Sequence, residues 1–215
     1  LDGQLALAFG ARGTGGRNPA AAHYETGKTV INLTKKNGAG SLAHEWWHAV
    51  DNHFARKDAE MGGKPAVQTA KGKTRHEFLT DRAGRNGSGS ASAINGAVYE
   101  LRRAMTAAAE NPWLDRSKEA DKGRKVPYFA TNIELAARSF EKFVKDRLTE
   151  RGMVNDYLAN IYQAGGAYPS TREMQTLGLT KAWSDVTAAT QASLDVKGDK
   201  GPKLTDADAW RLYAG

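Results

Sequence analysis

The chain contains the stretch Ser41-Leu42-Ala43-His44-Glu45-Trp46-Trp47-His48-Ala49-Val50-Asp51, in which two histidines and a glutamate form the pattern H-E-x-x-H. Residues four apart on a helix share a face, about 6 Å apart along the axis, so His44 and His48 could bind one ion. Glu45 follows the first histidine, where its carboxylate can reach an attacking water rather than the metal, as in zinc hydrolases. The stretch therefore predicts a helix that carries part of a catalytic zinc site.

Apolar residues surround these three polar side chains, which favours a buried helix over a solvated one. They are Leu42, Ala43, Trp46, Trp47, Ala49 and Val50. The alternative is a structural helix in which two core histidines and a glutamate are only hydrogen-bonded. We favour the metal site because three buried ionisable groups would otherwise need partners that this stretch does not explain.

The chain has 215 residues, enough for one sizeable core or for one domain with a long insertion. Hydrophobic residues make up 40% and charged residues 26%, as in globular proteins. It contains no run of eighteen apolar residues and no signal-peptide pattern, so we expect no membrane span. Because it begins with leucine, we expect a processed product or an excised domain. Cysteine is absent, so any zinc must be held by histidine and carboxylate.

The chain is basic: 31 lysines and arginines against 24 acidic residues give a net charge of +7. Such a surface could favour nucleic acid or acidic partners. The charges are, however, scattered through segments of mixed sign. We therefore favour an ordinary solvated surface and keep nucleic-acid contact as an alternative.

We expect a small N-terminal sheet ahead of the H-E-x-x-H helix. Residues 4–9 form a short apolar run, and apolar and polar residues alternate around Thr26-Gly27, which predicts a β-hairpin with its second strand at residues 28–34. In zinc peptidases such a strand can form the sheet edge that pairs with an extended peptide, so we expect the substrate along residues 28–34. The helix should follow Ser41, its N-cap, and end near Phe54.

The rest of the chain is predicted to be mainly helical, in a single α+β domain over residues 1–195. Residues 56–90 lack periodicity and predict a lid or a disordered loop. Residues 116–125 are a second polar stretch, so residues 56–125 would form a long insertion, and residues 196–215 a polar tail. Helices are expected over residues 92–110, 131–147, 154–162, 172–177 and 181–194.

A catalytic zinc site usually has three protein ligands, and the third must come from another element. Asp51 shares the face of the two histidines, but it lies about 10.5 Å along the axis from His44, too far for convergence on one ion. The longer motif H-E-x-x-H-x-x-G-x-x-H requires glycine and histidine where this chain has Asp51 and Phe54. The chain is therefore not a metzincin.

Three further residues are weaker candidates for the third ligand. Helical phase turns His53 away from His48, and His76 and Glu77 lie in the irregular segment. Glu134 is the favoured ligand because it opens a strongly amphipathic helix.

The neighbours of Glu134 leave two alternatives open. Arg138, one turn on, can orient its carboxylate, and Glu141, two turns on, is either the reserve ligand or a partner of a ligand histidine. Thr131 and Glu134 also have the spacing of a capping box, in which the glutamate would only close the helix N-terminus.

Several blocks of the chain resemble large polyvalent protein-associated domains of phage and conjugative-element proteins. They are Gly10-Ala11-Arg12-Gly13, Ala22-His23-Tyr24, Val30-Ile31-Asn32-Leu33-Thr34, the block from Gly38 to Asn52, and Glu134-Leu135-Ala136-Ala137-Arg138-Ser139-Phe140-Glu141. The same blocks are similar to the gluzincin metallopeptidases, in which a downstream helical glutamate completes H-E-x-x-H. The resemblance covers residues 1–55 and about 126–180, and it implies a zincin-like fold.

The resemblance implies Zn²⁺ held by His44, His48 and Glu134, with Glu45 as general base. In some relatives a tyrosine upstream of the ligand glutamate assists the reaction, which points to Tyr128 here, with packing beside Phe129 as the alternative.

We therefore expect a zinc-dependent metallopeptidase. The alternative is a basic module of a mobile-element protein that binds DNA or a host protein and keeps a structural, non-catalytic metal. A third expectation, from the resemblance alone, is a protease delivered into a recipient cell with phage or conjugative DNA; otherwise we expect the bacterial cytoplasm.

Overall fold

The computed structural model describes residues 5–10, 22–34, 38–60, 66–68, 74–75, 77–83, 93–161 and 166–195. His76 and the polar tail from residue 196 fall outside these residues. Within them, the protein is α+β, with a small three-stranded sheet near the N-terminus and seven helices, which confirms the predicted class. The predicted domain boundaries stay a prediction. No helix in the described ranges is long and apolar enough to cross a membrane.

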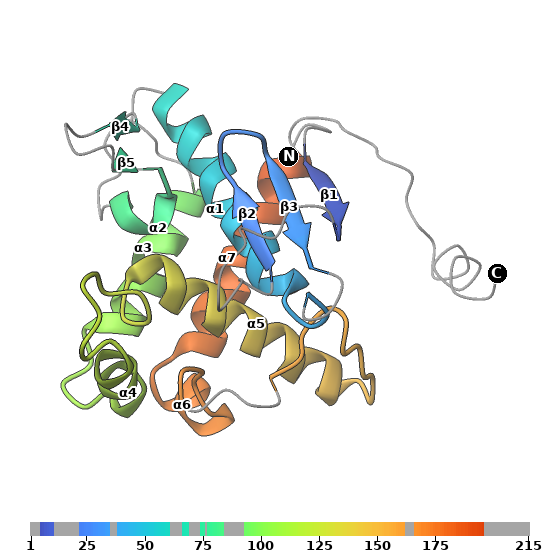
Figure 1. The fold of residues 1–215 in the computed structure, drawn as a ribbon. Coiled ribbons are helices and arrows are strands. Elements are labelled where there is room, and N and C mark those ends of the chain that lie inside the picture. Colours follow the sequence, from blue (N-terminus) through green and yellow to red (C-terminus); the bar gives the residue numbers. More distant parts are fainter. Residues whose placement is uncertain are drawn as a thin grey trace.

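Strands β1 (Ala6–Phe9), β2 (Ala22–Glu25) and β3 (Val30–Leu33) form this sheet in the order β1-β3-β2 (Figure 1). β2 and β3 pair antiparallel across a turn at residues 26–29, which confirms the predicted hairpin, and β1 runs parallel to β3. β3 is therefore central. The expected substrate edge at residues 28–34 is wrong, because β1 and β2 already occupy both sides of residues 30–33.

The helices follow the sheet in the chain, and a second small sheet pairs β4 (Val67–Gln68) with β5 (Thr74–Arg75). The helices are α1 (Leu42–Glu60), α2 (Leu79–Arg82), α3 (Ala93–Thr106), α4 (Pro112–Ala120), α5 (Asn132–Glu150), α6 (Thr171–Thr176) and α7 (Leu179–Asp195). α1 contacts β2 and β3 on one side and α5 on another, so it lies between the sheet and the helical layer (Figure 1).

Two of the predicted loops contain regular structure. α1 continues past Phe54 to Glu60, and β4, β5 and α2 lie within residues 56–90. The first half of residues 116–125 belongs to α4, which begins at Pro112 after Asn111, whose side chain accepts the Leu114 N–H at 2.9 Å. Proline at the first helical position and an Asn N-cap are standard start signals, which outweigh the polar composition that suggested a loop.

The helix predicted at residues 154–162 is wrong, because residues 154–161 form turns and irregular backbone. Two of their backbone carbonyls bind the start of α1. The Tyr157 carbonyl accepts the Gly40 N–H at 2.8 Å, and the Leu158 carbonyl accepts the Ala43 N–H at 2.9 Å. The segment therefore satisfies the Ala43 N–H, which the first turn of α1 leaves without a helical partner, and also binds the residue Gly40 just before the helix.

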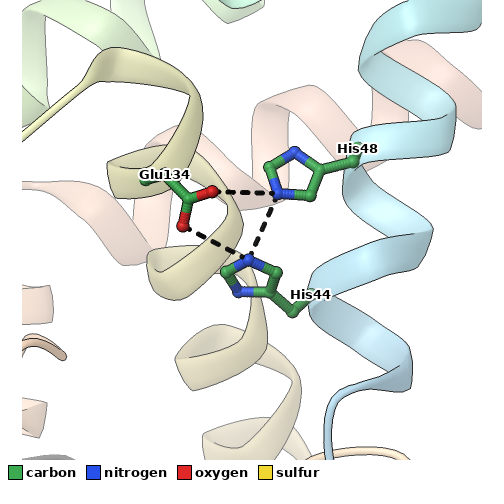
Figure 2. Close-up of side chains that lie close together, drawn as sticks. All are labelled: His44, His48 and Glu134. Carbon is green, nitrogen blue, oxygen red and sulfur yellow. Dashed lines mark hydrogen bonds and ion pairs between the residues drawn. The ribbon is translucent and has the colours of Figure 1, made fainter. Parts of the chain in front are cut away.

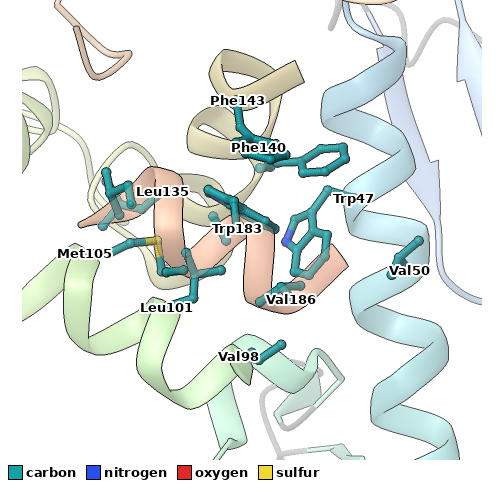
Figure 3. Close-up of a cluster of buried hydrophobic side chains, with 14 of the residues drawn as sticks. Trp47, Val50, Val98, Leu101, Met105, Leu135, Phe140, Phe143, Trp183 and Val186 are labelled. Carbon is teal, nitrogen blue, oxygen red and sulfur yellow. The ribbon is translucent and has the colours of Figure 1, made fainter. Parts of the chain in front are cut away.

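A core of aromatic side chains sets how α1, α5 and α7 pack (Figure 3). The indole of Trp47 meets that of Trp183 edge-on at 4.5 Å between ring centroids, and both rings contact Phe140. The Trp183 indole N–H donates to the Ser139 hydroxyl at 3.0 Å, so its polar group is satisfied inside the core. Since Ala49, on another face of α1, packs against β3, the helix is held from both sides.

The close contact at the start of α1 can be tested at Gly40. Its φ is 88°, and a Cβ built there would lie 2.2 Å from the Cβ of Asn160. We expect Gly40→Ala to lower the free energy of unfolding by more than about 1 kcal/mol, because the new methyl group is strained and displaces residues 157–160. Urea denaturation measures the change. Gly27→Ala is the control, since nothing lies within 4 Å of that Cβ; equal losses in both variants would contradict this account.

Candidate metal centre

Three donor groups from α1 and α5 converge at one point (Figure 2). The Nε2 atoms of His44 and His48 lie 3.2 Å apart. One carboxylate oxygen of Glu134 lies 3.5 Å from Nε2 of His44, and the other lies 3.6 Å from Nε2 of His48. The three side chains are therefore close enough to bind a metal ion.

The spacing of these atoms suits a small divalent cation. In a tetrahedral site with bonds of about 2.0–2.1 Å to nitrogen and oxygen, neighbouring ligand atoms lie roughly 3.3–3.4 Å apart. The two histidine nitrogens, 3.2 Å apart, lie close to this value, and each Glu134 oxygen lies slightly farther, at 3.5 or 3.6 Å, from a different one of these nitrogens. Two imidazoles and a carboxylate are also a ligand set that Zn²⁺ accepts, and three such ligands leave the fourth position of a tetrahedron open.

Glu134 sits in the first turn of α5, and its carboxylate faces the two histidines of α1. The Thr131 side chain caps the helix by accepting the Glu134 N–H at 3.4 Å. The Thr131 N–H donates to the Tyr128 carbonyl at 3.3 Å and so does not need the glutamate. Of the two alternatives, only the threonine half of the capping box is therefore present, and the carboxylate faces the histidines.

Arg138 holds the Glu134 carboxylate, as its position one turn on predicted. Its guanidinium donates to Glu134 at 2.8 Å and to the Phe129 carbonyl at 3.2 Å. The Arg138 side chain is almost fully buried, so this charge-assisted bond acts where solvent screens little. The bond fixes the direction in which the carboxylate oxygens point.

Burial and mutual attraction shift the pKa values of the three groups in different directions. Burial lowers the pKa of His44 to about 4, although Glu134 acts in the opposite sense. For His48, burial also lowers the pKa, but the hydrogen bond and charge of Glu134 outweigh it and raise the pKa. Burial would raise the pKa of Glu134, yet its hydrogen bonds with both histidines hold that pKa well below its usual range. The carboxylate is therefore charged at neutral pH.

Glu45 lies beside the three donors, at the boundary between α1 and β2. Its carboxyl accepts a hydrogen bond from the backbone N–H of Tyr24, and burial raises its pKa to about 7. A pocket of about 370 Å³ opens next to it. Its walls include Tyr24, Glu45, His48, Phe78, Ile133 and Glu134. The candidate base and two of the donors thus share one pocket.

Tyr128 also lines this pocket, with 41% of its surface exposed. Burial of its hydroxyl and the nearby Glu134 carboxylate raise its pKa. The loop that carries it is held by Asp121, whose carboxylate accepts the backbone N–H groups of Tyr128, Phe129 and Ala130 at 2.8, 3.0 and 2.8 Å. Sequence reasoning missed this role of Asp121, because no local pattern shows that its carboxylate folds back onto residues 128–130.

The other candidates point elsewhere. Asp51 accepts the backbone N–H and the hydroxyl of Thr80 at 2.8 and 2.6 Å, so it anchors α2 to α1, and burial raises its pKa to about 6. Neither His53 nor Glu77 belongs to the donor cluster of the described residues. Glu141 lies behind His44, with its carboxylate 3.7 Å from Nδ1. Its position therefore favours the partner alternative over the reserve ligand.

Residues 120–194, about a third of the chain, match the model of a protein family described as large polyvalent protein-associated domain 1. This match supports the resemblance to polyvalent-protein domains over that segment. It includes α5 with Glu134, whereas His44, Glu45 and His48 lie outside it. No curated protein and no solved structure matches the chain.

Metal uptake tests whether the three donors act together. We expect the purified protein to bind Zn²⁺, and His44→Ala, His48→Ala and Glu134→Ala each to weaken the affinity more than about 100-fold, since outer partners alone typically contribute 10–100-fold. Competition with a fluorescent chelator measures it. Glu150→Ala is the control on α5, because Glu150 pairs only with exposed Arg147 in the described structure. Wild-type affinity in the three donor variants would contradict the assignment.

Proposed function

We propose that this chain is a zinc-dependent metallopeptidase domain with a zincin-like fold. The observation that carries the proposal is the convergence of His44, His48 and Glu134, whose ligand atoms lie within 4.8 Å of one another, next to a pocket that Glu45 lines together with His48 and Glu134. A base next to three metal donors and an open space for substrate is the arrangement that metal-assisted hydrolysis requires.

When held by these three residues, Zn²⁺ supplies Lewis-acid chemistry that acidifies water and polarises a peptide carbonyl. Glu45 takes the proton from the attacking water and then passes it to the leaving amine. A carboxyl with a pKa near 7 suits both tasks, since it can accept a proton at neutral pH and release it again. Tyr128 lines the same pocket, and its hydroxyl donates a hydrogen bond to the oxyanion that develops on the carbonyl.

We propose that the substrate is a protein or peptide segment that lies along β2 rather than β3. β2 is an edge strand, and Ala22 and Tyr24 line the pocket. In an antiparallel strand, the backbone N–H and C=O groups of every second residue point to the same side. Because the Tyr24 N–H donates to Glu45, the backbone polar groups of residues 22 and 24 point away from β3, toward the open edge of β2. An extended peptide added at this edge would pass directly beside Glu45.

The alternative remains a basic module with a structural metal site. Structural zinc sites usually have four protein ligands and are closed, whereas the donor group found among the described residues has three members and borders a pocket. This difference favours catalysis. Salt-dependent DNA binding that survives chelation, without cleavage of peptides, would favour the alternative. Action in the bacterial cytoplasm or in a recipient cell is part of the proposal and rests on the polyvalent-protein resemblance.

The central test is Glu45→Gln, which removes the base and keeps the shape of the side chain. We expect the variant to retain Zn²⁺ and to lose about 10²–10⁴-fold in the rate of peptide cleavage, the usual contribution of general acid–base catalysis. Cleavage of a peptide library read by mass spectrometry gives the rate, and chelator competition gives the metal affinity. Glu60→Gln, at the exposed end of α1, is the matched control. Undiminished cleavage by Glu45→Gln would overturn the proposed mechanism.

A further inference from the structure

The second ring nitrogen of His44 faces a buried carboxylate. Nδ1 of His44 lies 3.7 Å from Oε2 of Glu141, on the side of the ring opposite to the donor cluster. Glu141 is only 2% exposed and sits on α5, two turns beyond Glu134. A shift of about half an ångström would bring the two atoms to the distance of a hydrogen bond.

Two segments far along the chain hold this carboxylate in place. The Tyr168 hydroxyl, just before α6, donates to Oε2 of Glu141 at 2.6 Å, a short bond typical of a charge-assisted contact. The backbone N–H of Asn160 also donates to the Glu141 carboxyl. A buried carboxylate with several donors cannot turn freely, so its position relative to His44 is defined by the fold.

His48 differs from His44 in this respect. Its Nδ1 is buried and has no hydrogen-bond partner among the described residues. An imidazole binds a metal through one nitrogen, and the hydrogen bond made by the other nitrogen sets its tautomer and its orientation. Among the residues that the structure describes, His44 is therefore the one ligand histidine whose second nitrogen faces a carboxylate that can set its tautomer and orientation.

We propose that Glu141 and Tyr168 are positioning residues for His44. Glu141 accepts the Nδ1–H of His44, which leaves the Nε2 lone pair directed at the point shared with His48 and Glu134, and Tyr168 fixes Glu141. This inference rests on the proposed metal centre but not on peptide cleavage. Glu134, Arg138, Glu141 and Tyr168 all lie in residues 120–194, so the family-matched segment supplies one donor together with the groups that orient it and His44.

The positioning role of Glu141 and Tyr168 can be tested by measuring the zinc affinity of the full chain. Competition with a fluorescent chelator gives this affinity. We expect Glu141→Gln to weaken binding about 10–100-fold, as outer partners of metal ligands do. Tyr168→Phe should weaken binding in the same direction by a smaller factor. Since the two residues act through one contact, the double variant should bind no more weakly than Glu141→Gln alone.

Matched controls separate positioning from general destabilisation. Tyr157→Phe removes a hydroxyl from an exposed tyrosine, and Glu150→Gln neutralises an exposed carboxylate at the far end of α5. Thermal unfolding of each metal-free variant is measured alongside, because a merely structural role would lower the unfolding temperature without changing the affinity. If Glu141→Gln does not fold, Tyr168→Phe, which loses a single oxygen, carries the test.

The outcomes distinguish this inference from the proposed function. Wild-type zinc affinity in both Glu141→Gln and Tyr168→Phe overturns the positioning role while leaving the metal centre standing. A wild-type protein that takes up no zinc overturns both the centre and this inference. Zinc binding that depends on Glu141, in a protein that cleaves no peptide, supports the inference and counts against the peptidase.

Discussion

The contact between the Glu134 carboxylate and the two α1 histidines is the constraint around which the described structure is organised. Two buried histidines and the largely buried Glu134 meet where α1 contacts α5, and burying a carboxylate or an imidazolium without a partner costs several kcal/mol. Here each group faces another, and Arg138 supplies a compensating charge. The same proximity that satisfies these groups also creates a cluster of donors spaced for a metal ion.

The surrounding structure keeps these groups at their separations. The contacts among Trp47, Phe140 and Trp183 fix the relative position of α1, α5 and α7. Ala49 packs against the sheet, and residues 157–160 bind the first turn of α1. Because protein interiors are close-packed, movement of α1 along its axis would disturb all three contacts at once. A metal site requires its ligand atoms to be held within about 0.5 Å of their positions, and a rigid α1 meets this requirement for His44 and His48.

The candidate metal centre combines residues from two parts of the chain, and only one of these parts matches a known protein family. The histidines and Glu45 precede the family-matched segment, which contributes Glu134 and its supporting groups. The two parts meet because α1 and α5 share a core, not because they are neighbours in the chain. A site of this kind is complete only in the folded domain, which couples any metal binding to folding.

Local patterns in the sequence determined the elements whose signals are short-range. The alternation around Thr26-Gly27 predicted the hairpin, the H-E-x-x-H spacing predicted that His44 and His48 share a face, and Thr131 marked the start of α5. The placement of Arg138 one turn after Glu134 likewise predicted their contact, because helical geometry alone brings such residues together.

Only the tertiary structure decided the features that depend on which segments meet. Residues 154–161 lost their predicted helix because their carbonyls bind the start of α1, and β3 became central because β1, from a separate segment, pairs with it in parallel. The sequence left open whether Glu141 is a ligand or a partner of a ligand histidine, and no local pattern indicated the roles of Tyr168 and Asp121. Each acts through a contact between residues distant in the chain or in a loop, and such contacts follow from packing rather than from periodicity.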